Sequence, residues 1–215
     1  MNQKISIELV NSIASEHLGS TVRDFAEVGL DTILKEGVFR DVPFFNTVVS
    51  LYQASVEIRQ QLFIQKIINF WKELPNTSLQ ERQKFVEWMG QNPKQKRIFG
   101  ENLLLLIDRA DSIEKPSILG RLLDRCTLGD ISYEDMMRLW FIVDRVYMPD
   151  LNYLTSFTYG IQSNPNIAAS LENAGLLILA GMEGGYLDKR LSGGVIYELN
   201  DYGKMLLQYG LDSAV

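Results

Sequence analysis

The stretch from Phe44 to Leu74 constrains the fold most, because it contains neither Gly nor Pro, the residues that most readily interrupt a helix. Counted with Val42, 18 residues in this stretch are apolar. Its charged side chains are Glu57, Arg59, Lys66, Lys72 and Glu73. A helix that is apolar around most of its circumference is normally buried. We therefore expect a central helix, which a break between Ser55 and Gln61 could divide.

Start and stop signals place further helices along the chain. Ser78 and Glu81 form a capping box, and Asn92-Pro93 combines a helix cap with a first-turn proline. Gly129 is a typical helix stop, and Ser132 offers another start. Apolar spacing predicts helices over 5–18, 20–36, 78–90, 92–110, 113–126 and 132–146.

The pattern changes after Pro149. It predicts helices over 150–159 and 165–174, strands over 176–180 and 195–199, and a last helix over 201–209 capped by Asn200. The fold class we expect is mainly α: a helical bundle domain over 1–148, followed by a small α+β module with a short β-hairpin over 149–215.

Two phrases in this tail resemble the end of a winged-helix module found in many prokaryotic proteins. The first is Ala-Gly-Leu-Leu at 174–177, and the second runs from Tyr197 to Leu207 as Tyr-Glu-Leu-Asn-Asp-Tyr-Gly-Lys-Met-Leu-Leu. Asn200 stands where the family usually has Thr, which keeps the capping chemistry. The resemblance implies a winged-helix-like shape for residues 149–215.

Two further resemblances concern the helical part. The turn from Gly129 to Glu134 looks like that of TerB-like tellurite-resistance modules, but Leu128 stands where the family has Asp, so no metal site is carried over. A helical region followed by a winged-helix-like tail also resembles uncharacterised bacterial and phage-defence (abortive-infection) proteins.

Charge is spread unevenly along the chain, whose net charge is −6. Residues 1–74 hold 7 basic and 9 acidic side chains, and residues 75–148 hold 11 basic and 11 acidic ones. Residues 149–215 hold 3 basic and 7 acidic side chains. The helix expected over 165–174 carries no Lys or Arg. Phosphate contacts supply most of the affinity of DNA-binding proteins, so we do not expect DNA to be the partner. Nucleic-acid regulation through the winged-helix-like module stays open as an alternative, with Lys189 and Arg190 as its basic contacts.

The sequence lacks the residues and motifs that several classes of enzyme and metal site require. The chain has one His and one Cys, and it contains no dinucleotide-binding, phosphate-loop or Gly-x-Ser-x-Gly motif. We expect His17 to lie near a helix end and Cys126 to be a buried structural thiol. We predict no catalytic, cofactor-binding or metal residues, no small-molecule substrate, and a protein that is not an enzyme. Three Asp-Arg pairs, at 108–109, 124–125 and 144–145, are interpreted as ion-pairing groups.

The expected location is cytoplasmic. Residues 2–8 contain no apolar run typical of a secretory signal, and the uncharged run from Val42 to Val56 is shorter than the roughly 20 residues that span a bilayer. An unpartnered Cys is compatible with a reducing compartment. A membrane-active effector that uses the 44–71 helix stays open as a second alternative.

The function we expect is docking to a protein partner, or self-association, in a regulatory protein of prokaryotic or phage defence. Aromatic residues and Arg are favoured anchors at such interfaces. The candidate interaction surface consists of Trp140, Tyr147, Tyr153, Tyr186, Lys189 and Arg190. Basic side chains at a helix start suggest a candidate anion contact, made of Lys94, Lys96 and Arg97.

Overall fold

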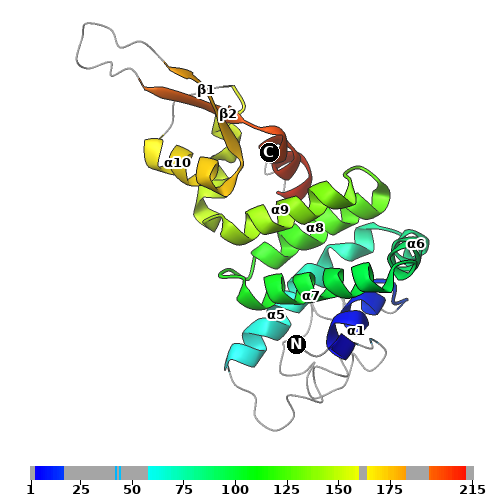
Figure 1. Ribbon diagram of the computed structural model, residues 1–215. Coiled ribbons are helices and arrows are strands. Elements are labelled where there is room, and N and C mark those ends of the chain that lie inside the picture. Colours follow the sequence, from blue (N-terminus) through cyan, green and yellow to red (C-terminus); the bar gives the residue numbers. More distant parts are fainter. Residues whose placement is uncertain are drawn as a thin grey trace, which may run out of the picture. The chain divides into compact units, whose positions relative to one another are not determined.

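The computed structural model describes residues 3–16, 42, 44, 58–159, 164–182 and 194–211. These residues are mainly helical, with one small antiparallel sheet near the C-terminus, so the predicted fold class is confirmed (Figure 1). The chain divides into two compact units, Met1–Ser132 and Tyr133–Val215. The boundary that the sequence suggested, after residue 148, differs from this division because the helix before it belongs to the second unit. The helix expected over 20–36 lies outside the described residues, as does His17.

The first unit is helical throughout its described part. Its elements are α1 (Gln3–Ile13), α5 (Ile58–Lys72), the short 3-10 helix η1 (Leu74–Asn76), α6 (Leu79–Gly90), α7 (Pro93–Arg109) and α8 (Lys115–Leu128). Helix α5 packs on α8 and α7, and α1 packs on α7 and α6. The core of the unit lies between these pairs.

Helix α5 is the described part of the predicted central helix, and one side of it is buried, whereas Leu62 is 48% exposed. Ile64, Ile67 and Phe70 are all buried, and the ring of Trp71 meets Phe44 edge to face at 5.8 Å between centroids. Residues 45–57 lie outside the described residues, so the length of this helix and its break stay predictions.

Two glycines allow the helix pairs to approach closely. A Cβ on Gly120 of α8 would lie 2.4 Å from the carbonyl oxygen of Phe70 on α5. A Cβ on Gly100 of α7 would lie 2.4 Å from the carbonyl oxygen of Ser6 on α1. Real Cβ atoms do not tolerate such distances, so both positions require glycine for backbone contact.

The predicted caps are present. The Ser78 hydroxyl accepts a hydrogen bond from the Glu81 amide while the Ser78 amide donates to Glu81 Oε2 at 2.9 Å, which completes the capping box. The Ser78 hydroxyl and the Ser78 amide both donate to the Glu81 carboxylate, and these two bonds lower the pKa of Glu81. Asn92 caps α7 through the Gln95 amide, and Gly129 ends α8 in the left-handed conformation at φ 85°.

The second unit combines helices with the sheet. Its elements are α9 (Tyr133–Arg145), the 3-10 helix η2 (Met148–Phe157), α10 (Pro165–Ala174), β1 (Leu177–Met182), β2 (Val195–Leu199), α11 (Asp201–Met205) and the π-helical turn η3 (Leu206–Gly210). The elements follow the predicted order, with η2 being a 3-10 helix where a helix over 150–159 was expected. Helix α10 contacts α9, η2 and β1.

Asn200 joins the sheet to the last helix. Its side chain accepts from the Gly203 amide at 2.8 Å, which confirms the predicted cap. The same side chain donates to the Gly175 carbonyl at 2.9 Å, and the Asn200 amide donates to Leu176. Arg138 of α9 stacks over Tyr202 of α11, with its guanidinium carbon 5.5 Å from the ring centroid. These contacts fix the base of the hairpin within the second unit.

Candidate functional site: the apolar hairpin face

The register of β1 and β2 defines one continuous apolar face. Leu177 pairs with Leu199, and both are buried at the base of the sheet. Beyond this pair, Leu179 lies opposite Tyr197, and Met182 lies opposite Val195. Cross-strand partners share a face, and residues two apart on one strand share it as well. We name the four outer residues, Leu179, Met182, Val195 and Tyr197, the hairpin face.

A β-bulge places Met182 on this face. The register shifts between Leu179 and Gly181, so that Ala180 has no partner on β2. In a regular ladder, Met182 would point to the opposite side of the sheet from Leu179, because their separation is odd. The extra residue in the bulge turns Met182 back to the same face as Leu179. Bulges commonly redirect a side chain in this way.

The hairpin face leaves the core and enters solvent. Leu179 is 56% exposed and Met182 is 79% exposed, whereas Leu177 is 3% exposed. Tyr197 and Val195 are half-buried. In Figure 1 the two strands extend beyond α10, which packs against β1. Contiguous exposed apolar side chains such as Leu179 and Met182 often mark an interaction site.

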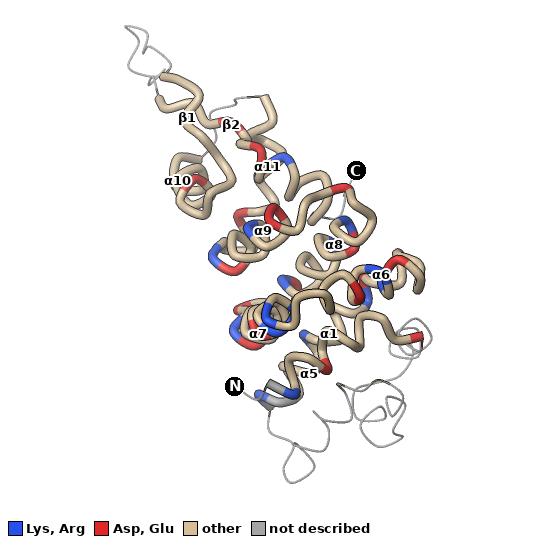
Figure 2. Tube along the Cα trace, turned by 45° about the vertical axis from the view of Figure 1, so that its right-hand side comes forward, with Lys and Arg blue, Asp and Glu red and all other residues tan. Residues whose placement is uncertain are grey.

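The exposed charges of the elements around the sheet are acidic. They are Glu172 on α10, Asp201 at the start of α11, and Glu198 on β2, which pairs with Ile178 on the face opposite the hairpin face. In Figure 2 no blue segment interrupts the described residues of α10, β1 or β2. Lys204 of α11 lies 3.7 Å from Asp201 and so offsets that carboxylate. The described part of the hairpin region therefore presents apolar side chains among negative charges.

The predicted aromatic surface separates into two groups. Tyr147 is 62% exposed and Tyr153 is 49% exposed, at the start of η2 and within it. Trp140 of α9 is 0% exposed, so it belongs to the core and not to the predicted surface. Its position on the strongly amphipathic α9 puts it on the same side as buried Met136 and Val143. Tyr186, Lys189 and Arg190 lie outside the described residues.

The predicted anion contact lies in the first turn of α7. Lys94 is exposed, and Lys96 and Arg97 are half-buried. Burial lowers the pKa of Lys96. The Asn92 side chain already accepts the Gln95 amide at 3.1 Å, so one of the amides that an anion would use is occupied.

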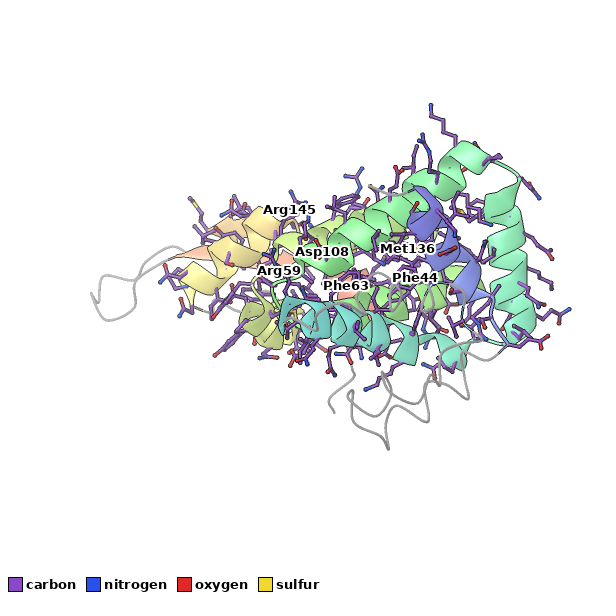
Figure 3. The ribbon with its side chains drawn as sticks, turned by 90° about the horizontal axis from the view of Figure 1, so that it is seen from below. Phe44, Arg59, Phe63, Asp108, Met136 and Arg145 are labelled. Atoms are coloured by element: carbon purple, nitrogen blue, oxygen red, sulfur yellow. The ribbon has the colours of Figure 1, made fainter. Side chains whose placement is uncertain are left out.

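The Asp-Arg pairs lie in three different environments. Asp108, labelled with Arg145 in Figure 3, is exposed near the end of α7, and its carbonyl accepts from Lys66 Nζ at 2.8 Å. Arg125 makes an ion pair with Asp130 at 3.3 Å. Arg145 of α9 donates to the Ala174 carbonyl at 3.2 Å. The ion pair of Arg125 with Asp130 fits the interpretation as ion-pairing groups. Asp108 also acts electrostatically on Lys66, where it opposes the effect of burial on the pKa of the lysine.

Asp124 belongs to a buried polar cluster between α6, α8 and η1. It is 3% exposed, and its Oδ1 accepts a hydrogen bond from Thr77 Oγ1. Burial raises the pKa of Asp124 to about 6, and Arg125 opposes this shift. Arg82, 5% exposed, is the cation that faces Asp124 from α6.

Arg82 holds several backbone segments together. Its Nε donates to the Ile13 carbonyl at 2.9 Å, and its Nη1 donates to Thr77 at 2.7 Å and to Leu74 at 3.2 Å. Its Nη2 reaches the Ser15 carbonyl at 3.4 Å. This guanidinium satisfies carbonyls at and after the end of α1 and at the start and after the end of η1, so we assign it to the structure of the first unit.

The described ranges were compared with the requirements of a metal site and of a membrane-spanning helix. No group of three or more His, Cys, Asp or Glu side chains suited to a metal ion occurs there. Among the helices described, none combines the length and hydropathy needed to cross a bilayer. Cys126 of α8 is half-buried rather than fully buried.

Sequence reasoning missed the hairpin face, although a signal was present. The run from Leu177 to Met182 is apolar without alternation, a pattern typical of a strand covered on both sides. The chain supplies one partner strand for it in the described sheet. A strand that is apolar on both faces but has one partner strand leaves some of its apolar side chains exposed.

Comparison with protein-family models, with curated proteins and with solved structures gives no match to this chain.

Proposed function

We propose that this protein works by non-enzymatic docking to another protein and that the hairpin face is its docking surface. The observation that carries the proposal is the continuation of a buried apolar face, from the Leu177–Leu199 pair, to exposed Leu179 and Met182. Contiguous apolar side chains in water are unfavourable at roughly 25 cal/mol per Å², so a partner that covers them gains free energy.

Exposed tyrosines add possible anchors in the same unit. Tyr147 and Tyr153 belong to the η2 region, which also contacts β2. Tyrosine is enriched in interface hot spots because it combines a large apolar ring with a hydrogen-bonding group. The likeness of the chain to abortive-infection proteins is the reason for extending the proposal to a regulatory role in prokaryotic or phage defence.

The test is size-exclusion chromatography of extracts of the source organism. It compares the elution volumes of the wild-type protein, a hairpin-face variant and a control variant. We expect the wild type to elute in an assembly larger than the free chain. Leu179→Ser combined with Met182→Ser should elute as the free chain. Leu105→Ser, on an exposed leucine of α7, is the matched control and should elute like the wild type. Elution of the wild type as the free chain, or identical elution of all three proteins, would contradict the proposal.

A further inference from the structure

The methionine side chains of this protein differ widely in their exposure to solvent. Met182, at the outer end of β1, is 79% exposed, whereas Met89 of α6 and Met136 of α9 are buried. The other methionines that the structure describes are half-buried, namely Met137, Met148 and Met205. Met1 lies outside the described residues. Among the described methionines, Met182 is therefore the one that a solute in water reaches most readily.

The β-bulge gives this exposed sulfur a defined place. It puts Met182 on the same face as Leu179 and opposite Val195 of β2. Leu179 is exposed as well, so the thioether belongs to the part of the hairpin face that continues into solvent. A chemical change at this sulfur therefore alters the proposed docking surface and leaves the buried core of the unit unchanged.

From this placement, we propose that Met182 is a site of reversible oxidation by hydrogen peroxide and that its sulfoxide switches docking off. The inference rests on the proposed docking function and adds a regulation of the same surface. The sulfur lone pair attacks one peroxide oxygen, and an S–O bond forms as the O–O bond breaks. The departing hydroxide takes the proton of the transferred hydroxyl and leaves as water. The sulfur is oxidised by two electrons, and the peroxide is reduced by the same two.

The sulfoxide makes this position of the face polar. Its oxygen is a hydrogen-bond acceptor that water hydrates in the free chain, and a partner that covers the face removes this water. Leu179 and Val195 have no side-chain donor that could replace it. Because burial of a polar group without a hydrogen bond is unfavourable, we expect oxidation to weaken docking at least about fivefold.

The first measurement is the rate of oxidation at each methionine. The purified full chain is treated with hydrogen peroxide at neutral pH, and peptide mapping by mass spectrometry gives the fraction of sulfoxide at each position over time. We expect Met182 to react at least about tenfold faster than Met89 or Met136, since oxidation follows exposure. A rate at Met182 that does not exceed those of the buried and half-buried methionines would overturn the inference.

The second measurement compares docking before and after oxidation. Tagged, purified chain is oxidised, freed of peroxide with catalase and added to an extract of the source organism for size-exclusion chromatography. We expect the reduced chain to elute in the larger assembly and the oxidised chain to elute mainly as the free chain. Repair by methionine sulfoxide reductases, one for each sulfoxide epimer, should restore the assembly. An oxidised chain that stays in the assembly would overturn the switch.

Two variants assign the response to position 182, each compared with itself before and after peroxide. Met182→Leu has an apolar side chain without sulfur, so its elution should not respond to peroxide. Met137→Leu, which replaces a half-buried methionine of α9, is the matched control and should respond like the wild type. Cys126 is present in both variants. A response that persists in Met182→Leu would assign the effect to another sulfur and overturn the inference.

A readout without a partner supports the assignment independently. On a hydrophobic-interaction column, the retention of the purified wild type should fall after oxidation, because the exposed apolar surface becomes more polar. The retention of Met182→Leu should change less than that of Met137→Leu, and equal changes would overturn the inference. Thermal melting followed by circular dichroism checks that both variants are folded.

The failure of this inference is distinguishable from the failure of the docking function. Elution of the reduced wild type as the free chain would contradict docking, and the switch with it, before any peroxide is added. Docking of the reduced chain that oxidation of Met182 leaves unchanged would overturn the switch alone.

Discussion

Asp124 is a buried carboxyl group whose surroundings favour its neutral form. Thr77 donates one hydrogen bond to it, and burial raises its pKa to about 6 from an ordinary value of 3.8. The folded protein therefore binds this proton more tightly than the unfolded chain does. The nearby charged groups are Arg125 and Arg82, which lower the pKa, and Glu73 and Glu81, which raise it. It follows that the contribution of Asp124 to stability falls as the pH rises from about 4 to about 7.

Asp124→Asn tests this reasoning. The amide still accepts from Thr77 but carries no charge, so the variant should be more stable than the wild type at pH 7.5 by about 1 to 3 kcal/mol. The difference should shrink toward zero as the pH approaches 4. Urea unfolding at several pH values measures it, with exposed Glu87→Gln as the control. A difference between Asp124→Asn and wild type that is independent of pH would contradict the assigned pKa.

Arg82 is expected to be the most sensitive charged position in the first unit. Arg82→Met removes the donors to the Ile13, Leu74, Thr77 and Ser15 carbonyls, and we expect a loss of at least about 3 kcal/mol. The control is Lys84→Met, an exposed position on the same helix, which should change the free energy of unfolding little. Chemical denaturation measures the free energy of unfolding of both variants. Equal losses in Arg82→Met and Lys84→Met would refute the structural role of Arg82.

The sequence could not reveal this buried cluster. Thr77 and Asp124 are 47 residues apart, and Arg82 reaches a carbonyl 69 residues away, so tertiary packing creates both contacts. The sequence did show Asp124 as part of an Asp-Arg pair, and that local pattern does not tell a buried carboxyl group from an exposed one. The same limit explains the error at Trp140. Its aromatic side chain suggested an interaction surface, but the packing of α9 buries it.

At the scale of helices, Gly120 and Gly90 form a matched pair. Gly120→Ala places a Cβ against the Phe70 carbonyl and should destabilise the protein by about 1 to 3 kcal/mol. Gly90→Ala, at the exposed end of α6 with no atom within 4 Å of the added Cβ, should stabilise it by about 0.5 to 1 kcal/mol. Thermal melting compares the stability of the two variants. If both substitutions stabilise the protein, the close approach of α5 to α8 is contradicted.

Local signals predicted many of the elements well, because capping and turn chemistry act within a few residues. The Ser78 box, the Asn92-Pro93 start and the strand from Val195 to Leu199 are all present. The 3-10 form of η2 was not predicted, since helical spacing alone does not distinguish 3-10 from α geometry. The bulge at Ala180 was also missed, because it depends on register with β2. Consequently the site was less predictable than the elements that carry it.

At the scale of the molecule, the charge distribution and the two compact units support one account. The first unit buries Ile64, Ile67 and Phe70 of α5, which packs against α8 and α7. The second unit leaves apolar side chains exposed on the hairpin face. The tail that holds this face carries a charge of −4 out of −6. On our proposal, the second unit is the part that contacts a partner.

Site-specific photo-crosslinking tests the central claim most directly. A benzophenone amino acid replaces Met182 in one protein and exposed Leu105 in another, and both are irradiated in cells of the source organism. The account predicts a discrete protein adduct from position 182 that disappears when Leu179→Asp is added, and no such adduct from position 105. The same adducts from both positions, or no adduct from position 182, would contradict the claim that the hairpin face is a docking surface.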